Sequence, residues 1–169
     1  MRNIITLLAM SILLCTACVA QPKVDNTVSG DLKLDQYLGD WYEIARFDHS
    51  FERGIQFSKA NYTLREDGKV QVINSGIKDG KAKESKGKAK LTDNPRILKV
   101  SFFGPFYSDY RVMLLDADYQ WALIGSGSAK YLWILSRTPE LPKETLDTFL
   151  VEAQRRGYDT SKLIWVKQK

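Results

Sequence analysis

Cysteine is nearly missing from this 169-residue chain, which has only Cys15 and Cys18, both close to its beginning. The rest of the sequence therefore offers no disulfide, no thiol nucleophile and no cysteine ligand for a metal. Histidine is present once, as His49, which excludes a zinc site of the histidine-rich kind within one chain. These shortages exclude much of enzyme chemistry, and we expect neither a metal nor a cofactor.

Motifs that carry catalysis are missing as well. The sequence contains no glycine-rich phosphate loop, no GxSxG nucleophile motif and no pair of carboxylates placed for acid–base work. His49, with Asp48 and Glu52 nearby, is the remaining candidate for a general base. A loop histidine at the end of a strand is the simpler interpretation, and we expect no catalytic residue.

Long hydrophobic runs are few, and the one at the start of the chain is short. Ile4–Leu14 follows Arg2 and is too short to span a bilayer comfortably. Thr16, Ala17 and then Cys18 follow, an order that resembles a bacterial lipoprotein signal. We therefore predict a signal peptide over residues 1–17, lipid modification of Cys18 and a polar tether over residues 18–33. An ordinary secretory signal cleaved near Ala20 is the alternative, because Cys15 stands where lipoprotein signals usually carry Leu.

The charge and the residue after Cys18 bear on location. Val19 follows the cysteine where inner-membrane lipoproteins carry Asp, so it favours the outer membrane. The net charge of +5 and the pI near 9.1 suit attraction to anionic lipid head groups, or plain solubility. Nucleic acid is not an expected partner, because an exported protein rarely meets it.

The remaining sequence, roughly 150 residues, is enough for one domain with a core, and it is rich in short β-type runs. Turn signals such as Asp79-Gly80 and Gly104-Pro105 separate these runs. The predicted strands are 41–48, 59–65, 69–77, 82–92, 96–103, 108–116, 119–125 and 130–137. A helix from Pro142 to Gly157 and a short strand over 163–166 complete the pattern. We predict an all-β fold over residues 34–169, an eight-stranded antiparallel up-and-down barrel with one C-terminal helix.

Alternation along these strands predicts which side chains face the interior. One parity collects most of the large apolar residues and is predicted to face inward. It includes Leu114 on strand 108–116 and Trp121, Leu123 and Gly125 on strand 119–125. The opposite parity of the later strands is apolar enough to need the helix as a cover. An eight-stranded barrel is either filled by side chains or holds one small ligand, and both remain open here. The predicted pocket residues are Tyr62, Val72, Val100, Phe102, Phe106, Val112, Leu123, Tyr131 and Trp133.

Two further segments suggest contact with lipid. Residues 78–90 hold six lysines against two acids, which indicates either a solvated strand face or a weak patch for lipid head groups. The lysines change parity between Lys83 and Lys86, so we expect a bulge there or a later strand start. Phe106 and Tyr107 fall in a reversal, where they would pack under a loop or form an apolar lip at an entrance.

Three motifs in order resemble the lipocalin family. They are Gly39-Asp40-Trp41 followed by YEIAR, Asp118-Tyr119 within LDADYQWALI, and Arg137 within YLWILSRTP. The combination is similar to the bacterial outer-membrane lipocalins, apolipoprotein D and the plant temperature-induced lipocalins. The resemblance implies a calyx with Gly39, Trp41, Tyr119 and Arg137 at its closed end. Loops 49–55, 77–81, 104–107 and 126–129 would then surround the open end.

The resemblance also implies a function. It suggests a non-enzymatic protein that binds, stores or transports fatty acids or lysophospholipids and contributes to envelope maintenance under stress. Such a protein would be held by lipid on Cys18 in the outer membrane, with its barrel in the periplasm, and a homodimer stays open. A lipid-modifying barrel enzyme and a filled structural barrel without ligand are the alternatives.

Overall fold

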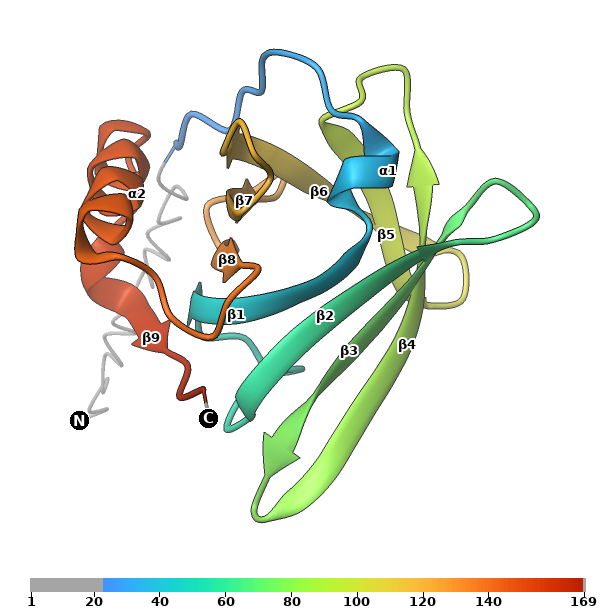
Figure 1. Ribbon diagram of the computed structural model, residues 1–169, viewed down its shortest axis with the longest axis horizontal. Coiled ribbons are helices and arrows are strands. Elements are labelled where there is room, and N and C mark those ends of the chain that lie inside the picture. The colour runs from blue at the N-terminus through green and yellow to red at the C-terminus, as the bar shows by residue number, and fades with distance from the viewer. Residues whose placement is uncertain (1–22, 169) are drawn as a thin grey trace, which may run out of the picture.

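The computed structural model describes residues 23–168, so the predicted signal peptide and Cys18 lie outside the described residues. Its main feature is an antiparallel barrel of eight strands with a helix on its outer surface (Figure 1). Each strand pairs with the next along the chain, and β1 pairs with both β2 and β8, which closes the barrel. The strands are β1 Gly39–Phe47, β2 Gln56–Leu64, β3 Val70–Lys78, β4 Lys81–Leu91, β5 Ile97–Phe103, β6 Phe106–Leu115, β7 Trp121–Gly125 and β8 Leu132–Ser136. The predicted fold is thereby confirmed.

The expected helix and final strand are also present. Helix α2, Lys143–Arg155, begins directly after Pro142, which stands at its N-cap. It lies along the outside of the barrel, where Phe149 and Ala153 pack with a second apolar cluster. A short 3₁₀ turn, η1 Thr160–Lys162, leads into β9, Leu163–Trp165. This strand pairs antiparallel with the last residues of β1. The helix covers the apolar outer face of the later strands, as the alternation predicts.

One element at the base was not expected. Helix α1, Leu34–Tyr37, is a single turn immediately before β1. Its last residue, Tyr37, is buried, and its carbonyl accepts a 2.8 Å hydrogen bond from the indole Nε1 of Trp41. The turn is too short to leave a helical periodicity, so the sequence gives no signal for it.

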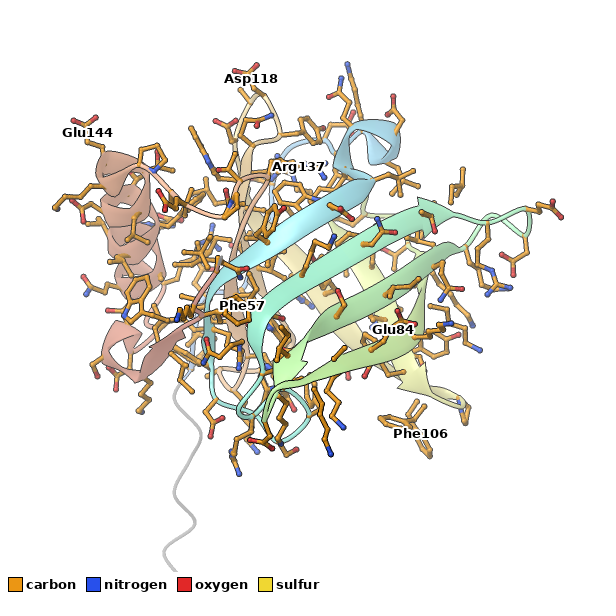
Figure 2. All side chains as sticks on the ribbon, turned by 60° about the horizontal axis from the view of Figure 1, so that its bottom comes forward. Phe57, Glu84, Phe106, Asp118, Arg137 and Glu144 are labelled. Carbon is orange, nitrogen blue, oxygen red and sulfur yellow. The ribbon has the colours of Figure 1, made fainter. Side chains whose placement is uncertain are left out.

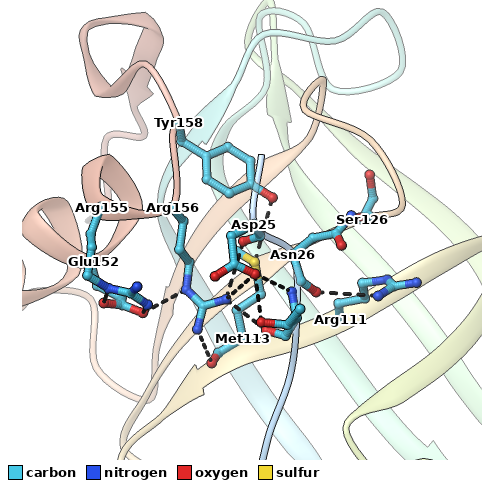
Figure 3. Close-up of polar contacts among 10 residues, drawn as sticks. Asp25, Asn26, Arg111, Met113, Ser126, Glu152, Arg155, Arg156 and Tyr158 are labelled. Atoms are coloured by element: carbon cyan, nitrogen blue, oxygen red, sulfur yellow. Dashed lines mark hydrogen bonds and ion pairs between the residues drawn. The ribbon is translucent and has the colours of Figure 1, made fainter. Parts of the chain in front are cut away.

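The N-terminal segment, residues 24–33, lies along the barrel from one end to the other. Asp25 donates its backbone N–H to the carbonyl of Arg156, and the Asn26 side chain donates to the carbonyl of Ser126 in the β7–β8 loop (Figure 3). Arg156 in turn contacts Glu152, whose pKa it lowers with Arg155 to about 2. At the other end, Lys33 donates its N–H to the Tyr119 hydroxyl. This part of the expected tether is therefore packed against the domain.

The prediction of which β7 side chains face the interior was wrong. Trp121, Leu123 and Gly125 were expected inside, but Ala122 and Ile124 belong to the interior cluster and Leu123 packs in the outer cluster beneath α2. Nearly every residue of this strand is buried, because the helix covers its outer face. A strand that is apolar on both faces gives no alternation from which to read the inner one.

A bulge changes the parity of β6 as well. The register between β6 and β7 shifts between Val112 and Leu114. Val112 faces the interior, whereas Met113 and Leu114 both belong to the outer cluster and Leu115 returns to the inner one. The prediction that Leu114 faces inward was wrong for this reason.

Strand β4 is regular where a bulge or a later start was expected. Its pairing with β3 is continuous from Lys81 to Ala89. Lys83 therefore shares a face with the buried Gly87 and Ala89, while Lys86 lies on the other face. Residues 81–86 are all exposed, so this end of the β3–β4 hairpin extends beyond the packed core and tolerates lysine on either face.

Candidate functional site

The closed end of the barrel is sealed by stacked side chains. Trp41 is fully buried, and the guanidinium carbon of Arg137 lies 3.9 Å from the centre of its ring. Arg137 also donates to the carbonyl oxygens of Gln36 and Asp40, each at 2.7 Å, and to that of Tyr119 at 3.2 Å. The structure thus brings together the motif residues expected at this end, on β1, on the β6–β7 loop and after β8. Figure 2 shows Arg137 and Asp118 at this end of the barrel.

Gly39 makes this arrangement sterically feasible. Its φ is +95°, a conformation that side chains rarely adopt, and a first side-chain carbon there would lie 3.4 Å from Nη1 of Arg137. A side chain at this position would therefore be strained and would crowd the guanidinium.

Above this floor, the buried Tyr37 and Tyr62 and the partly buried Tyr110 join their hydroxyl groups inside the barrel. The Tyr110 hydroxyl is 2.6 Å from that of Tyr37 and accepts a 3.0 Å hydrogen bond from that of Tyr62. Burial raises the pKa of all three, most strongly for Tyr37 and Tyr110. The cluster is therefore neutral at physiological pH and satisfies its own hydrogen bonds in the lower interior.

The upper interior is less completely filled. Tyr62, Val72 and Val112, three of the predicted pocket residues, are fully buried in the lower core. Val100, Phe102 and Trp133 are inward-facing members of the same cluster but remain partly exposed. These three side chains form an apolar part of the inner wall that the packed core does not cover completely.

A glycine on β4 accommodates one of these wall residues. A first side-chain carbon at Gly87 would lie 2.8 Å from ring atoms of Phe102, closer than such atoms approach in proteins. The Phe102 ring therefore lies flat over the β4 backbone, and the glycine makes that close approach feasible.

The other predicted pocket residues occupy different places. Tyr131 precedes β8 and stacks on Trp133, with ring centres 5.7 Å apart and planes 4° from parallel. Phe106 is 79% exposed at the rim. Leu123 lies outside the barrel wall and is not a pocket residue.

A buried polar network, missed in the sequence, lies just below the open end. Glu52, from the β1–β2 loop, accepts hydrogen bonds from the Asn74 amide at 3.1 Å and from the Trp133 indole at 3.2 Å. His49 Nε2 lies 3.0 Å from the same carboxylate, with its ring stacked on Phe51. His49 is only 6% exposed, so it is a buried partner of Glu52 rather than a histidine open to solvent.

Two charged residues of β1 support this network from within the wall. The Arg46 guanidinium contacts the Glu43 carboxylate and donates to the carbonyl oxygens of Glu52 and Ile55. Burial and the nearby Glu52 carboxylate raise the pKa of Glu43 to about 8, against the opposing effect of Arg46. Burial also opposes ionisation of Glu52, but its contacts with His49 and Trp133 outweigh that and lower its pKa. Glu52 therefore carries a negative charge facing the interior, while Glu43 holds its proton.

Some polar atoms of this network are unsatisfied. Within residues 23–168, Asn74 Oδ1 and His49 Nδ1 are buried without a hydrogen-bond partner. Side chains three residues apart in a regular strand point to opposite faces, and only the bulge between Glu43 and Ala45 allows Glu43 and Arg46 to meet, so their spacing did not reveal the network. The site as a whole combines an apolar wall, an acidic group below the rim and, beside that group, buried polar atoms without a hydrogen-bond partner.

The rim itself is aromatic and basic. Phe51, Phe103 and Phe106 are 52%, 77% and 79% exposed. Tyr107, expected with Phe106 as an apolar lip, instead packs beneath Lys90, whose ammonium lies 4.4 Å from its ring centre. The apolar surface of the rim is therefore formed by the three phenylalanines.

A separate groove of about 500 Å³ lies on the outer face of the barrel. Tyr42, Lys59 and Ser75 form its floor across β1–β3, and none of the predicted pocket residues lines it. It is open and of mixed polarity, so the interior remains the better candidate for an apolar ligand.

The described part of the chain has neither a metal-binding cluster nor a helix that could cross a membrane. Residues 23–168 contain no group of three or more His, Cys, Asp and Glu side chains that could hold a metal ion. No helix among them has the length and apolar character needed to cross a membrane.

Comparison with known proteins places the chain in a family. Residues 32–168 match the family described as a lipocalin-like domain. The outer membrane lipoprotein Blc of Escherichia coli is 47% identical over 165 residues, covering 95% of this chain and 93% of that protein. Temperature-induced lipocalin-1 of Arabidopsis thaliana is 39% identical, covering 83% and 82% of the two chains. Mouse apolipoprotein D is 34% identical, covering 83% and 79%.

Solved structures agree on the fold. The crystal structure of the cockroach allergen Per a 4 superposes with a TM-score of 0.69 at 20% identity, covering 88% of this chain and 96% of that one. At this level of identity the likeness concerns the fold alone.

Proposed function

Because the chain belongs to the lipocalin family, we propose that it binds a single-chain lipid, a fatty acid or a lysophospholipid, in the upper half of its barrel. The observation that carries the proposal is the partly exposed apolar wall of Val100, Phe102 and Trp133 above a sealed base. The family consists generally of binding proteins, and we propose a binding role without catalysis.

The free energy gained by burying an acyl chain against such a wall is enough for binding. Burial of ten methylene groups contributes roughly 8 kcal/mol at ~0.8 kcal/mol for each. Association costs of several kcal/mol leave a micromolar or somewhat tighter dissociation constant. Specific polar contacts are therefore unnecessary for binding, although they decide which lipid is preferred.

The charges support one orientation of the ligand. The ionised Glu52 below the rim disfavours a carboxylate or phosphate buried beside it. Lys78, Lys81 and Lys83 at the β3–β4 hairpin attract such groups instead. The lipid would therefore enter tail first and keep its anionic head among these lysines. Charge reversal at the lysines should weaken binding of lysophosphatidic acid more than binding of a neutral monoacylglycerol.

Native mass spectrometry of the protein purified from bacterial envelopes tests the proposal directly. One added mass per chain that matches a lipid would support it. The tryptophans offer a second readout, since Trp133 lies in the upper wall whereas Trp41 is sealed in the base. Fatty acid should quench the fluorescence of the wild type, and Trp133→Phe should remove most of the quenching. An empty barrel whose fluorescence does not respond would favour a filled structural barrel.

We further propose that lipid on Cys18 holds the protein in the outer membrane, with the barrel in the periplasm. The similarity to outer membrane lipoproteins supports this, and it is independent of the barrel interior. A cysteine that carries more than one acyl chain anchors stably. Cys18→Ala should lose the acylated mass and the outer-membrane fractionation of the wild type while retaining the folded barrel. Unchanged fractionation of that variant would contradict the anchor.

A further inference from the structure

The open end of the barrel is the apolar and basic end of the molecule. Phe51, Phe103 and Phe106 project there from the β1–β2 and β5–β6 loops, and each is more than half exposed. Figure 2 shows Phe106 at the opposite end of the barrel from Arg137 and Asp118. Three exposed phenylalanines at one rim exceed the scattered apolar residues of an ordinary surface.

Basic side chains surround these rings. The rim loops and the end of the β3–β4 hairpin carry four acidic residues, Asp48, Glu52, Asp79 and Glu84, and five basic ones, Arg53, Lys78, Lys81, Lys83 and Lys130. Glu52 is buried against His49, and Glu84 forms an ion pair with Lys86. Asp48 is neutralised by an ion pair with Arg53, whereas none of the four lysines has an ion pair within the described part of the chain. The rim therefore presents unpaired positive charge around an apolar centre.

The closed end has mixed charge. Its loops contain several acids, namely Glu66, Asp67, Asp93, Asp116 and Asp118, next to the basic residues Arg65, Lys69, Arg96 and Arg137, and Asp67 forms ion pairs with Arg65 and Lys69. Leu64 and Leu91 are about half exposed there, but they stand beside these carboxylates. An anionic lipid surface therefore attracts the open end more than the closed one.

The N-terminal segment begins near the open end of the barrel. Lys23 lies against Gly157, where a first side-chain carbon would meet the Lys23 carbonyl at 3.4 Å. Asn26 then bonds to the β7–β8 loop at the open end, and the chain reaches the closed end only at Lys33. Anything joined before Lys23 therefore emerges near the open end.

Covalent reach limits the orientation further. Five Cα–Cα steps join Cys18 to Lys23, and even fully extended they span no more than about 18 Å. The tilted strands make the barrel roughly 20–25 Å tall, given about 3.3 Å for each of nine residues in β2. A lipid on Cys18 could not reach the membrane if the closed end lay against it. This step rests on the anchor proposed above.

We propose that the protein docks its open end on an anionic phospholipid surface. Phe51, Phe103 and Phe106 enter the head-group region, and the rim lysines bind lipid phosphates around them. The single entrance of the barrel then faces the membrane, so that a lipid passes between bilayer and interior without crossing open water.

Site-specific fluorescence on the anchored protein tests this orientation. The lipoprotein acylated on Cys18 is reconstituted in vesicles of phosphatidylethanolamine and phosphatidylglycerol. Its cysteine variants carry an environment-sensitive dye at the open end (Ser128→Cys), on α2 (Val151→Cys) or at the closed end (Glu66→Cys). We expect lipids with a nitroxide on the acyl chain to quench the dye at position 128 severalfold more than at 151 or 66. Equal quenching at all three, or strongest quenching at 151 or 66, would overturn the proposal.

Matched variants test the surface itself. In the Ser128→Cys background, serine at Phe51, Phe103 and Phe106 together should abolish most of the quenching. Serine at the similarly exposed Leu64 and Leu91 should leave it unchanged. Omission of phosphatidylglycerol should reduce the quenching, and an unchanged signal would contradict the role of the lysines. Intact mass measured on the same samples reports acylation of Cys18, so a missing anchor is distinguished from a wrong orientation.

Discussion

Arg137 lies with its guanidinium over the face of Trp41, 3.9 Å from the ring centre, and donates hydrogen bonds on either side of it. The two residues are 96 positions apart in sequence, and their contact joins the first strand to the segment after the eighth. It seals the base of the barrel at the place where β1 pairs with β8.

Arg137→Ala should destabilise the fold by about 1–3 kcal/mol, because it removes the cation–π contact and the hydrogen bonds to the carbonyl groups of Gln36, Asp40 and Tyr119. Arg137→Lys should recover little of this, since an ammonium cannot donate to carbonyl groups in several directions at once. Urea unfolding followed by fluorescence measures both. Full stability of the lysine variant would show that charge alone matters at this position.

Tyr110→Phe should cost more than Tyr62→Phe, although each removes one hydroxyl group. The Tyr110 hydroxyl forms hydrogen bonds with both other tyrosines, so its removal leaves two buried hydroxyl groups without a partner. Each unsatisfied group lowers the free energy of unfolding by about 1–3 kcal/mol. Tyr62→Phe breaks one bond and leaves the other intact. Thermal unfolding of the two variants gives the comparison, and equal losses would contradict the central role of Tyr110.

Glu43 should make the stability depend on pH between about 4.5 and 8, from its ordinary value to its raised pKa. An acid whose pKa is higher in the folded chain holds its proton more tightly there, so the free energy of unfolding falls as pH rises through this window. Glu43→Gln should remove that slope. Urea midpoints across the range measure it, and parallel profiles for the two proteins would refute the assignment. Glu52, whose pKa is lowered, acts below pH 4.5 and does not confuse the result.

Val100→Trp should block the interior and weaken fatty-acid binding at least about tenfold, which is ~1.4 kcal/mol. Its matched control is Lys99→Trp, because the neighbouring residue points outward from the same strand and is exposed. The control should fold and bind as the wild type does, apart from a small loss from its ion pair with Asp109. Isothermal titration measures both variants, and equal affinities would place the ligand elsewhere.

The sequence was most informative where local physics decides the structure. Turn residues such as Asp79-Gly80 and Gly104-Pro105 separate the strands, and Gly80 and Gly104 both have positive φ in the structure. The apolar face of α2 predicted the helix that covers the barrel. The three motifs predicted the fold and the residues at its closed end.

The failures have physical causes. Leu123 was misplaced because helix and barrel bury both faces of β7, and Leu114 was misplaced by a bulge that alternation cannot reveal. The network around Glu52 escaped detection because its members come from β1, β3, β8 and a loop, and only the closed barrel brings them together.

The sealed base also has a kinetic consequence. A container with one opening cannot be loaded while it is occupied, so an incoming lipid has to wait until the resident one has left. The rate of exchange is then the dissociation rate of the first lipid and does not increase with the concentration of the second. Because Arg137 and Trp41 close the end opposite the entrance, a lipid enters and leaves by the same opening, and the barrel holds one lipid instead of passing lipids through.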